Sequence, residues 1–501
     1  MSSKRICSAA YYLLSAMAAV IIINNVIIGV FSDYVTKKYF AAGYPLLFAV
    51  AVLFVILMIR FGDTLMLTYS PGIVACLCVA AFFIQIFLGY QTLFITSSWD
   101  AGRVLTAAYN VATYQIGLVD IDYFSYYPNN KGIFLLDYAV CKTLRIAGIL
   151  TLKKALIGVM CIEAFMSSLA AYLLYRVTFM VTDSDAAPAF AWMIYMLLLG
   201  LSGWVIVPYT DMSVIAFPLI IFYLYLRMDG SPWDYLRCCL IAAFTALGFI
   251  VKPTVAIMII AIVICRLVSG TYLFKTPRIG RGLARTAIVV VMFFFSAFAV
   301  FWLCDRVYLR TGMTIDAEKN TGPLHMLMMG LNDSNDGAMT WEDIEYSQSF
   351  DTKDERTAGQ LSKIKDILSS YTPGGFLSHL SRKALVVFND GTFAWGEEGG
   401  FYDERLSSGG PGDLLRDITY KGGPYYSLFS SIFQVIWYAV LVLLLFIPGV
   451  ARDEKHLIPA VAVIGIVIFN LLFEARARYL IVYAPIIILT AVMMGAYTMR
   501  Y

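Results

Sequence analysis

Residues 287–304 read AIVVVMFFFSAFAVFWLC, an unbroken apolar run without a charged side chain. A helix that crosses a bilayer needs roughly 20 such residues, and only a helix satisfies the backbone polar groups of a single segment within lipid. The whole chain shares this character: of its 501 residues, 60% are hydrophobic and 14% are charged, and the mean hydropathy is +0.75. A soluble domain carries about a quarter charged residues. The sequence therefore predicts an all-α polytopic membrane protein.

Similar apolar segments recur on both sides of this run. They lie near 10–31, 43–60, 70–96, 131–149, 154–181, 188–206, 212–227, 237–251, 253–268, 286–307, 425–449, 457–473 and 479–497. Several are short or adjoin one another, so they predict about 11–14 transmembrane helices. Counting from the two ends of the chain gives opposite parities across 131–268. Either 154–181 forms two short helices, or two neighbouring segments form a single crossing.

The charged residues divide the chain and orient it. Lysine and arginine favour cytoplasmic loops, and the loop 266–285 holds five of them without an acid. Lys4, Arg5, Arg452 and Lys455 mark the same side. We expect a transmembrane module at 1–308 with an external loop at 97–130, an extracytoplasmic α or α+β domain at 309–424, and C-terminal transmembrane helices at 425–501.

Several classes of function are disfavoured by the sequence. The nine cysteines lie in or beside apolar runs, and the three histidines lack metal-ligand spacing, so neither a disulfide framework nor a thiolate zinc site is expected. The sequence has no phosphate-binding loop, dinucleotide fingerprint or nucleophile elbow. No basic stripe with interleaved aromatic residues indicates nucleic acid.

The external loop opens with Trp99-Asp100 directly after a long apolar segment. A carboxylate at such a boundary can act as a general base toward a hydroxyl group. The simpler alternative is an interfacial aromatic belt in which Asp100 caps the helix that starts near Ala101. Asp100 could also hold a divalent metal ion together with Asp120 or Asp122, although no histidine is nearby in the sequence.

Two arginines, Arg476 and Arg478, lie between two apolar segments on the expected outer face. Arginine near a membrane is expensive unless it pairs or reaches the interface. Its planar fork matches the geometry of phosphate, so the pair suits the headgroup of a phospholipid-like ligand. The alternative is a salt bridge with Glu474.

Two further ionisable residues interrupt apolar segments. Lys252 precedes Pro253, which ends or kinks a helix at that point. A buried lysine needs a counter-charge, which phosphate would supply, unless its side chain reaches a nearby interface. Asp211 lies at the junction of two apolar segments, where capping of a helix by Thr210 or Asp211 is the simpler interpretation.

In order, these elements resemble the GT-C class of membrane glycosyltransferases, in the branch of protein O-mannosyltransferases and lipid A aminoarabinose transferases. The resemblance rests on an acid in the first large external loop, a later acid, a lysine before proline, a large external domain and a late Arg-Tyr pair. The Tyr-Pro-Asn-Asn element at 127–130 and the segments 325–331 and 389–392 are similar to uncharacterised Gram-positive members. The sequence departs from the mannosyltransferases at Ala101, where they have a second acid. It also has two or three helices before the loop, where the family usually has one.

The resemblance implies a glycosyltransferase of a bacterial plasma membrane. The donor would be a sugar on a polyprenyl phosphate, and the acceptor a hydroxyl of a cell-envelope glycan, lipid or protein. Asp100 would be the base, and Lys252, Arg476 and Arg478 would bind the donor phosphate. The implied substrate-binding residues are Arg103, Tyr127, Asn129, Asn130, Asp211 and Tyr479. The alternative is a transporter or flippase of a lipid-linked glycan, which would need polar residues along a path through the membrane.

Overall fold

The computed structural model describes residues 3–31, 39–65, 70–92, 99–182, 184–269, 279–398, 409–447 and 454–498. Within these ranges the chain is mainly helical and forms no strand, which confirms the all-α fold. The α+β alternative for 309–424 does not apply to the described residues of that segment. Arg452 and residues 270–278 of the basic loop lie outside the described residues.

A bundle of apolar helices makes up most of the described structure. Eight helical stretches are long and apolar enough to cross a membrane, and four more apolar helices are shorter. Twelve such helices in the described ranges fall within the predicted number. The bundle contains α1 (Ser3–Ile23), α3 (Tyr44–Leu65), α4 (Pro71–Thr92), α8 (Leu152–Val181), α9 (Ala187–Tyr195), α11 (Phe217–Leu226), α12 (Trp233–Val251), α13 (Ala256–Ser269), α14 (Ile279–Leu309), α21 (Tyr426–Leu443), α22 (Glu454–Leu472) and α23 (Ala484–Thr498).

The predicted crossing at 131–149 is not one of these helices. This segment forms α7 (Lys131–Ile146), which carries Asp137, Lys142 and Arg145 as well as Lys131 and is not among the apolar helices. The segment 154–181 lies within one continuous helix, α8, rather than two short ones. With α7 removed from the crossings and each apolar helix crossing once, the parities counted from the two ends agree.

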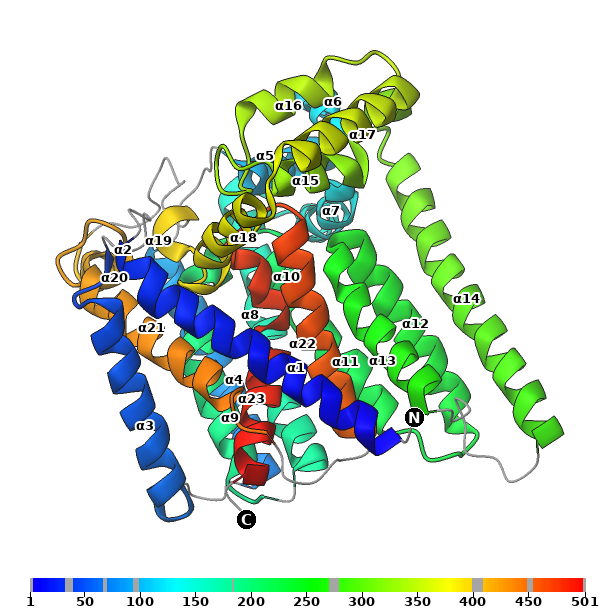
Figure 1. The fold of residues 1–501 in the computed structure, drawn as a ribbon. Helices are drawn as coiled ribbons and strands as arrows, with labels where there is room; N and C mark the ends of the chain where they lie inside the picture. Colours follow the sequence, from blue (N-terminus) through cyan, green and yellow to red (C-terminus); the bar gives the residue numbers. More distant parts are fainter. Residues whose placement is uncertain are drawn as a thin grey trace.

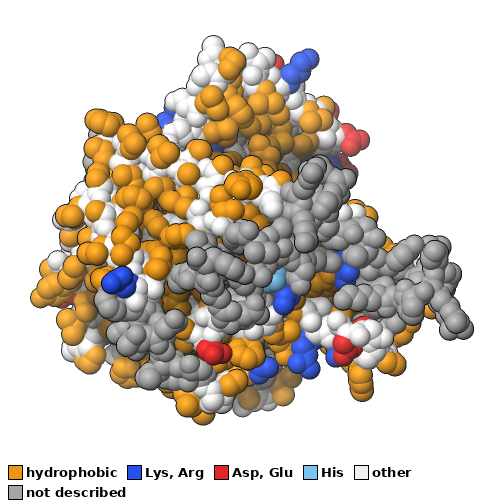
Figure 2. Space-filling model, turned by 60° about the horizontal axis from the view of Figure 1, so that its bottom comes forward, with side chains coloured by type: hydrophobic (Ala, Val, Ile, Leu, Met, Phe, Trp, Pro, Cys, Tyr) orange, Lys and Arg blue, Asp and Glu red, His pale blue; other side chains and the backbone are white. Residues whose placement is uncertain are grey.

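The flank of the bundle is apolar and the polar helices gather at one end. In Figure 1, α5 (Asp100–Ala112), α6 (Ile121–Tyr126) and α7 lie at the top, and the start of α1 and the end of α23 lie at the opposite end. Figure 2 shows hydrophobic side chains covering a broad part of the surface. On α14, which packs along α12, Phe294, Phe295 and Phe298 are exposed. Such a surface is stable when lipid covers it.

The segment predicted as one soluble domain lies in two places. Its first half forms a small unit above the bundle with its own core of Met328, Leu331 and Ile364. Its second half packs on the bundle, where Phe388 and Phe393 belong to the main core. The helices of the first half are α15 (Gly322–Leu331), α16 (Trp341–Gln348) and α17 (Lys353–Ser370), and those of the second are α18 (Pro373–Phe388), α19 (Trp395–Glu398) and α20 (Pro411–Thr419).

Candidate functional site

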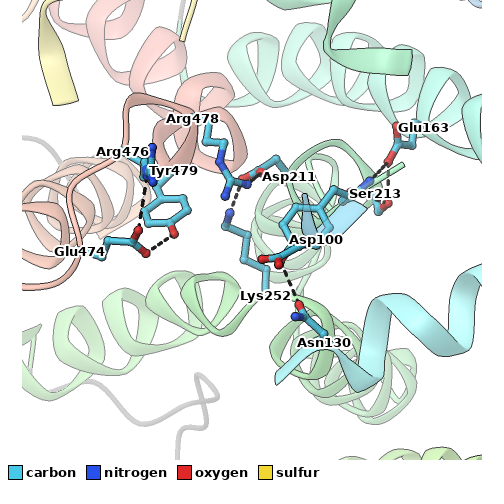
Figure 3. Close-up of polar contacts among 11 residues, drawn as sticks. Asp100, Asn130, Glu163, Asp211, Ser213, Lys252, Glu474, Arg476, Arg478 and Tyr479 are labelled. Carbon is cyan, nitrogen blue, oxygen red and sulfur yellow. Dashed lines mark hydrogen bonds and ion pairs between the residues drawn. The ribbon is translucent and has the colours of Figure 1, made fainter. Parts of the chain in front are cut away.

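Three charged side chains far apart in the sequence meet at the polar end of the bundle (Figure 3). Arg478 Nη1 donates to Asp211 Oδ2 at 2.9 Å, and Lys252 Nζ donates to Asp211 Oδ1. All three residues are buried. A buried charge requires a partner of opposite sign, so the two cations and the carboxylate stabilise one another. We call Asp211, Lys252 and Arg478 the ionic triad.

Breaks in three helices place the triad. Lys252 follows Val251, the last residue of α12, and its backbone is extended (φ −147°, ψ 107°). The cause is Pro253, because a proline disfavours helical geometry at the residue before it. Asp211 lies in the one-turn helix α10 (Thr210–Ser213) that joins two apolar segments. Arg478 lies in the 3-10 helix Ala477–Tyr483 that precedes α23. The capping interpretation of Asp211 is wrong, because α10 has no side-chain cap and Asp211 pairs with the two cations.

Asp100 lies beside the triad, linked to it by aromatic residues. The Tyr209 hydroxyl lies 3.1 Å from Asp100 Oδ2 and 3.0 Å from Asn130 Oδ1, and Asn130 Nδ2 donates to the Tyr123 hydroxyl. Asp100 is half-buried and is the first residue of α5, whose N-cap is Trp99 and lacks a side-chain cap bond. The interpretation of Asp100 as a helix cap is therefore not what the structure shows.

Aromatic rings enclose the guanidinium group of Arg478. Its Cζ atom lies 4.9 Å from the ring centre of Trp99, 5.3 Å from that of Tyr209 and 5.2 Å from that of Tyr479. The Lys252 ammonium lies 4.5 Å from the same Tyr479 ring. Cations are attracted to the faces of such rings. Trp99 precedes Asp100 in the chain, Tyr209 is bonded to Asp100, and both rings contact Arg478. Asp100 and the three residues of the ionic triad therefore form one site.

The second arginine has a different partner. Arg476 Nε lies 3.4 Å from Glu474 Oε1, and the Tyr479 hydroxyl donates to Glu474 Oε2 at 2.6 Å. The side chain of Arg476 is 28% exposed, whereas that of Arg478 is 8% exposed. The alternative of a salt bridge with Glu474 therefore holds for Arg476, whereas Arg478 pairs with Asp211 in the ionic triad.

Of the other predicted site residues, Tyr127 and Asn130 lie near Asp100. Burial and then the Asp100 carboxylate raise the pKa of Tyr127 to about 12, so its hydroxyl keeps its proton at neutral pH. Asn130 is buried in the bonds described above, but its neighbour Asn129 is exposed. Asn129 therefore lies outside the hydrogen-bond network around Asp100, and Asn130 lies within it.

Arg103 lies at the edge of this network, with its Cζ atom 5.4 Å from the ring centre of Tyr123, whereas Asp122 faces another partner. Arg103 lies 4.0 Å from Asp120, and Asp122 accepts from Lys319 at 2.8 Å; these side chains are largely exposed except for that of Lys319. Asp120 also caps α6 by accepting from the Tyr123 amide. Among the described residues no group of three or more His, Cys, Asp or Glu side chains could hold a metal ion. The metal alternative named only two carboxylates, Asp100 with Asp120 or Asp122, and Asp120 and Asp122 have Arg103 and Lys319 as partners.

Three residues of the site escaped the sequence analysis. The sequence predicts Trp99 only as part of an interfacial aromatic belt and predicts no role for Tyr209. Glu163, a fully buried acid within the apolar α8, accepts from the Tyr209 amide at 3.1 Å and from Ser213 Oγ at 3.0 Å. It thereby holds the turn that carries Asp211. Its isolation in an apolar helix was a signal, because ionisable residues are rare in transmembrane segments and are commonly functional.

Comparison with known proteins places the whole chain in one group. A family model described as "Conserved hypothetical integral membrane protein" matches residues 2–499. The comparisons with curated proteins and with solved structures gave no match.

Proposed function

The chain belongs to that family of integral membrane proteins, and we propose that it is a GT-C-type glycosyltransferase. It would move a sugar from a polyprenyl-phosphate donor to an extracytoplasmic acceptor hydroxyl. The observation that carries the proposal is the meeting of Asp100 and the ionic triad at one end of the bundle. A base for the acceptor and cations for the lipid phosphate have to lie within the length of one sugar of each other.

The topology supports a site on the extracytoplasmic side of the membrane, which for the proposed enzyme would be a bacterial plasma membrane. If each of the twelve apolar helices crosses once, the N-terminus, the loop 266–285 and the segment 444–453 share one side. These segments carry the basic residues that favour the cytoplasm. The site and the segment 309–424 then lie on the other side, where α5 and α15 are found.

The charge of the triad fits a phosphodiester. Two cations and one carboxylate leave an excess of one positive charge, which matches the single negative charge of a polyprenyl phosphosugar. When the bond between the anomeric carbon and the phosphate oxygen breaks, the leaving phosphate gains a second negative charge. Cations already in place stabilise this growing charge without rearranging. In this mechanism Arg478 and Lys252 bind the phosphate, and Asp211 holds them in position.

Asp100 would remove the proton of the acceptor hydroxyl as its oxygen attacks the anomeric carbon. The bond from the Tyr209 hydroxyl orients this carboxylate. Tyr127 remains a phenol and can donate to a sugar oxygen. A transporter of a lipid-linked glycan is favoured less, because the charged residues of this site gather at one end of the bundle.

The test compares Asp100→Asn with Asp120→Asn in purified protein in lipid nanodiscs. Radiolabelled polyprenyl-phosphate sugars are offered as a panel together with a cell-envelope glycan preparation, and the label transferred to the glycan is counted. Wild type should transfer one of the sugars, and Asp100→Asn should lower the rate by about 10²–10⁴-fold. Asp120→Asn should keep the rate, because asparagine caps a helix as well as aspartate does. Full activity of Asp100→Asn would remove Asp100 as the base.

A further inference from the structure

A fully buried lysine joins the small unit of α15, α16 and α17, here called the extramembrane unit, to the segment that carries the two arginines. Lys383, on α18, donates to the Gly330 carbonyl at 2.6 Å and to the Phe473 carbonyl at 2.7 Å. Gly330 lies in the last turn of α15, and Phe473 follows the last residue of α22. Each carbonyl is close to a helix C-terminus, where such groups lack partners within the helix. One side chain therefore ties the ends of two helices together.

Other contacts close the same junction. His379, one turn before Lys383, has its Nε2 3.1 Å from the Gly330 carbonyl. Gly330 packs so closely on Leu472 and Phe473 that a Cβ atom there would overlap their backbone. The Ala475 amide donates to the Gly337 carbonyl at 2.8 Å. The backbone from 472 to 475 is thus held against the turn 330–337 of the extramembrane unit.

Residues 472–475 lead directly to the two arginines. Glu474 follows Phe473, and Arg476 and Arg478 follow within four residues. The backbone of Arg476 is extended (φ −149°, ψ 130°), so a displacement at Phe473 would be transmitted along a short, stretched chain. We propose that Lys383 is a positioning residue that locks residues 473–478 to the extramembrane unit and so sets the affinity of Arg478 for an anionic lipid headgroup. The affinity part rests on the proposed function.

The chemistry of lysine suits a contact with the Gly330 and Phe473 carbonyls that persists as the pH changes. A lysine side chain has at least two N–H donors whether or not it is protonated, so both carbonyls stay bonded as the pH changes. Burial lowers the pKa of Lys383 to about 7, while the charge of Glu474 opposes that shift. Methionine at this position would fill similar space but leave two carbonyls without this donor. Arginine would keep donors for both.

The experiment uses full-length protein in nanodiscs and two readouts. Hydrogen exchange of the amides at 473–478 reports the lock, and titration with farnesyl methyl phosphate, a lipid phosphodiester of constant charge, reports binding. Lys383→Met should speed exchange at 473–478 by about tenfold or more while amides at 457–470 keep their rates, and it should weaken binding by about tenfold. Lys383→Arg should restore both within about threefold, and Lys365→Met, an exposed lysine on α17, should match wild type.

Two results at residues 473–478 would overturn the inference. One is unchanged exchange at 473–478 in Lys383→Met; the other is faster exchange there with unaltered affinity. Faster exchange at 457–470 as well would show general unfolding and would equally remove the specific role. Failure of the proposed function has a separate signature, because wild type would then fail to bind the diester while the exchange rates still differed between the variants.

Discussion

Arg476 and Arg478 are two residues apart and have opposite surroundings. Arg476 is partly exposed and pairs with Glu474, whereas Arg478 is buried with Asp211 and three aromatic rings. In a continuous strand both side chains would point to the same face. The chain changes from extended backbone at Arg476 to a 3-10 helix at Ala477, and this change turns Arg478 inward. Two similar residues in a short motif can therefore have different roles, and local backbone geometry decides which.

The largest expected effect is on the stability of the fold, and it distinguishes the ionic triad from the pair of Glu474 and Arg476. Asp211→Ala would leave Lys252 and Arg478 buried without their shared carboxylate, which typically costs about 3–5 kcal/mol. Glu474→Ala should cost less, because its partner Arg476 reaches solvent. Thermal unfolding midpoints in nanodiscs measure the difference. Equal midpoints for the two variants would show that the triad is no more critical to folding than the outer pair.

The second effect concerns binding. Arg478→Met should weaken binding of farnesyl methyl phosphate by about 30–100-fold, equivalent to about 2–3 kcal/mol. The fold should persist, because Asp211 keeps Lys252 as a partner. Arg476→Met should change the affinity by less than about threefold, since its guanidinium group faces Glu474. A larger loss for Arg476→Met would reverse the assignment of the two arginines.

The third effect tests the junction just before the two arginines through its pH dependence. The pKa of Lys383 is lowered from 10.5 to about 7, so between these values the unfolded chain binds more protons than the folded one. The stability of the folded state should therefore rise as the pH increases above 7. The unfolding midpoint of wild type should gain a few degrees from pH 7 to pH 9 relative to Lys383→Met. Parallel curves would show that Lys383 does not titrate in this range.

The smallest effect on stability and binding is expected for Arg103 and Asp120, at the exposed edge of the site. Arg103 and Asp120 are more than half exposed and 4.0 Å apart, and such pairs contribute about 0–1 kcal/mol. Arg103→Met should leave both the unfolding midpoint and the affinity for farnesyl methyl phosphate nearly unchanged. A marked loss of affinity would extend the binding site outward, to the exposed face of α5.

The sequence predicted the bundle well because hydropathy acts over whole segments. It misassigned 131–149, where Asp137 and three basic residues interrupt the apolar pattern and α7 forms outside the set of apolar helices. Asp211, Lys252 and Arg478 stood out because each is an ionisable residue in apolar surroundings. Their mutual pairing could not be predicted, because it depends on how α10, α12 and the 3-10 helix at 477 pack together. Lys383 escaped notice for the opposite reason, since a lysine on an amphipathic helix usually faces water.

The contact between Trp99 and Arg478 gives the site an intrinsic optical probe. An indole ring in an edge-on pair with Tyr209 and 4.9 Å from a guanidinium carbon emits light according to the electric field around it. An anion arriving at Arg478 changes that field without touching the indole. In a variant that retains Trp99 as its sole tryptophan, the emission wavelength would follow occupancy of the site in real time, with no label attached to lipid or protein.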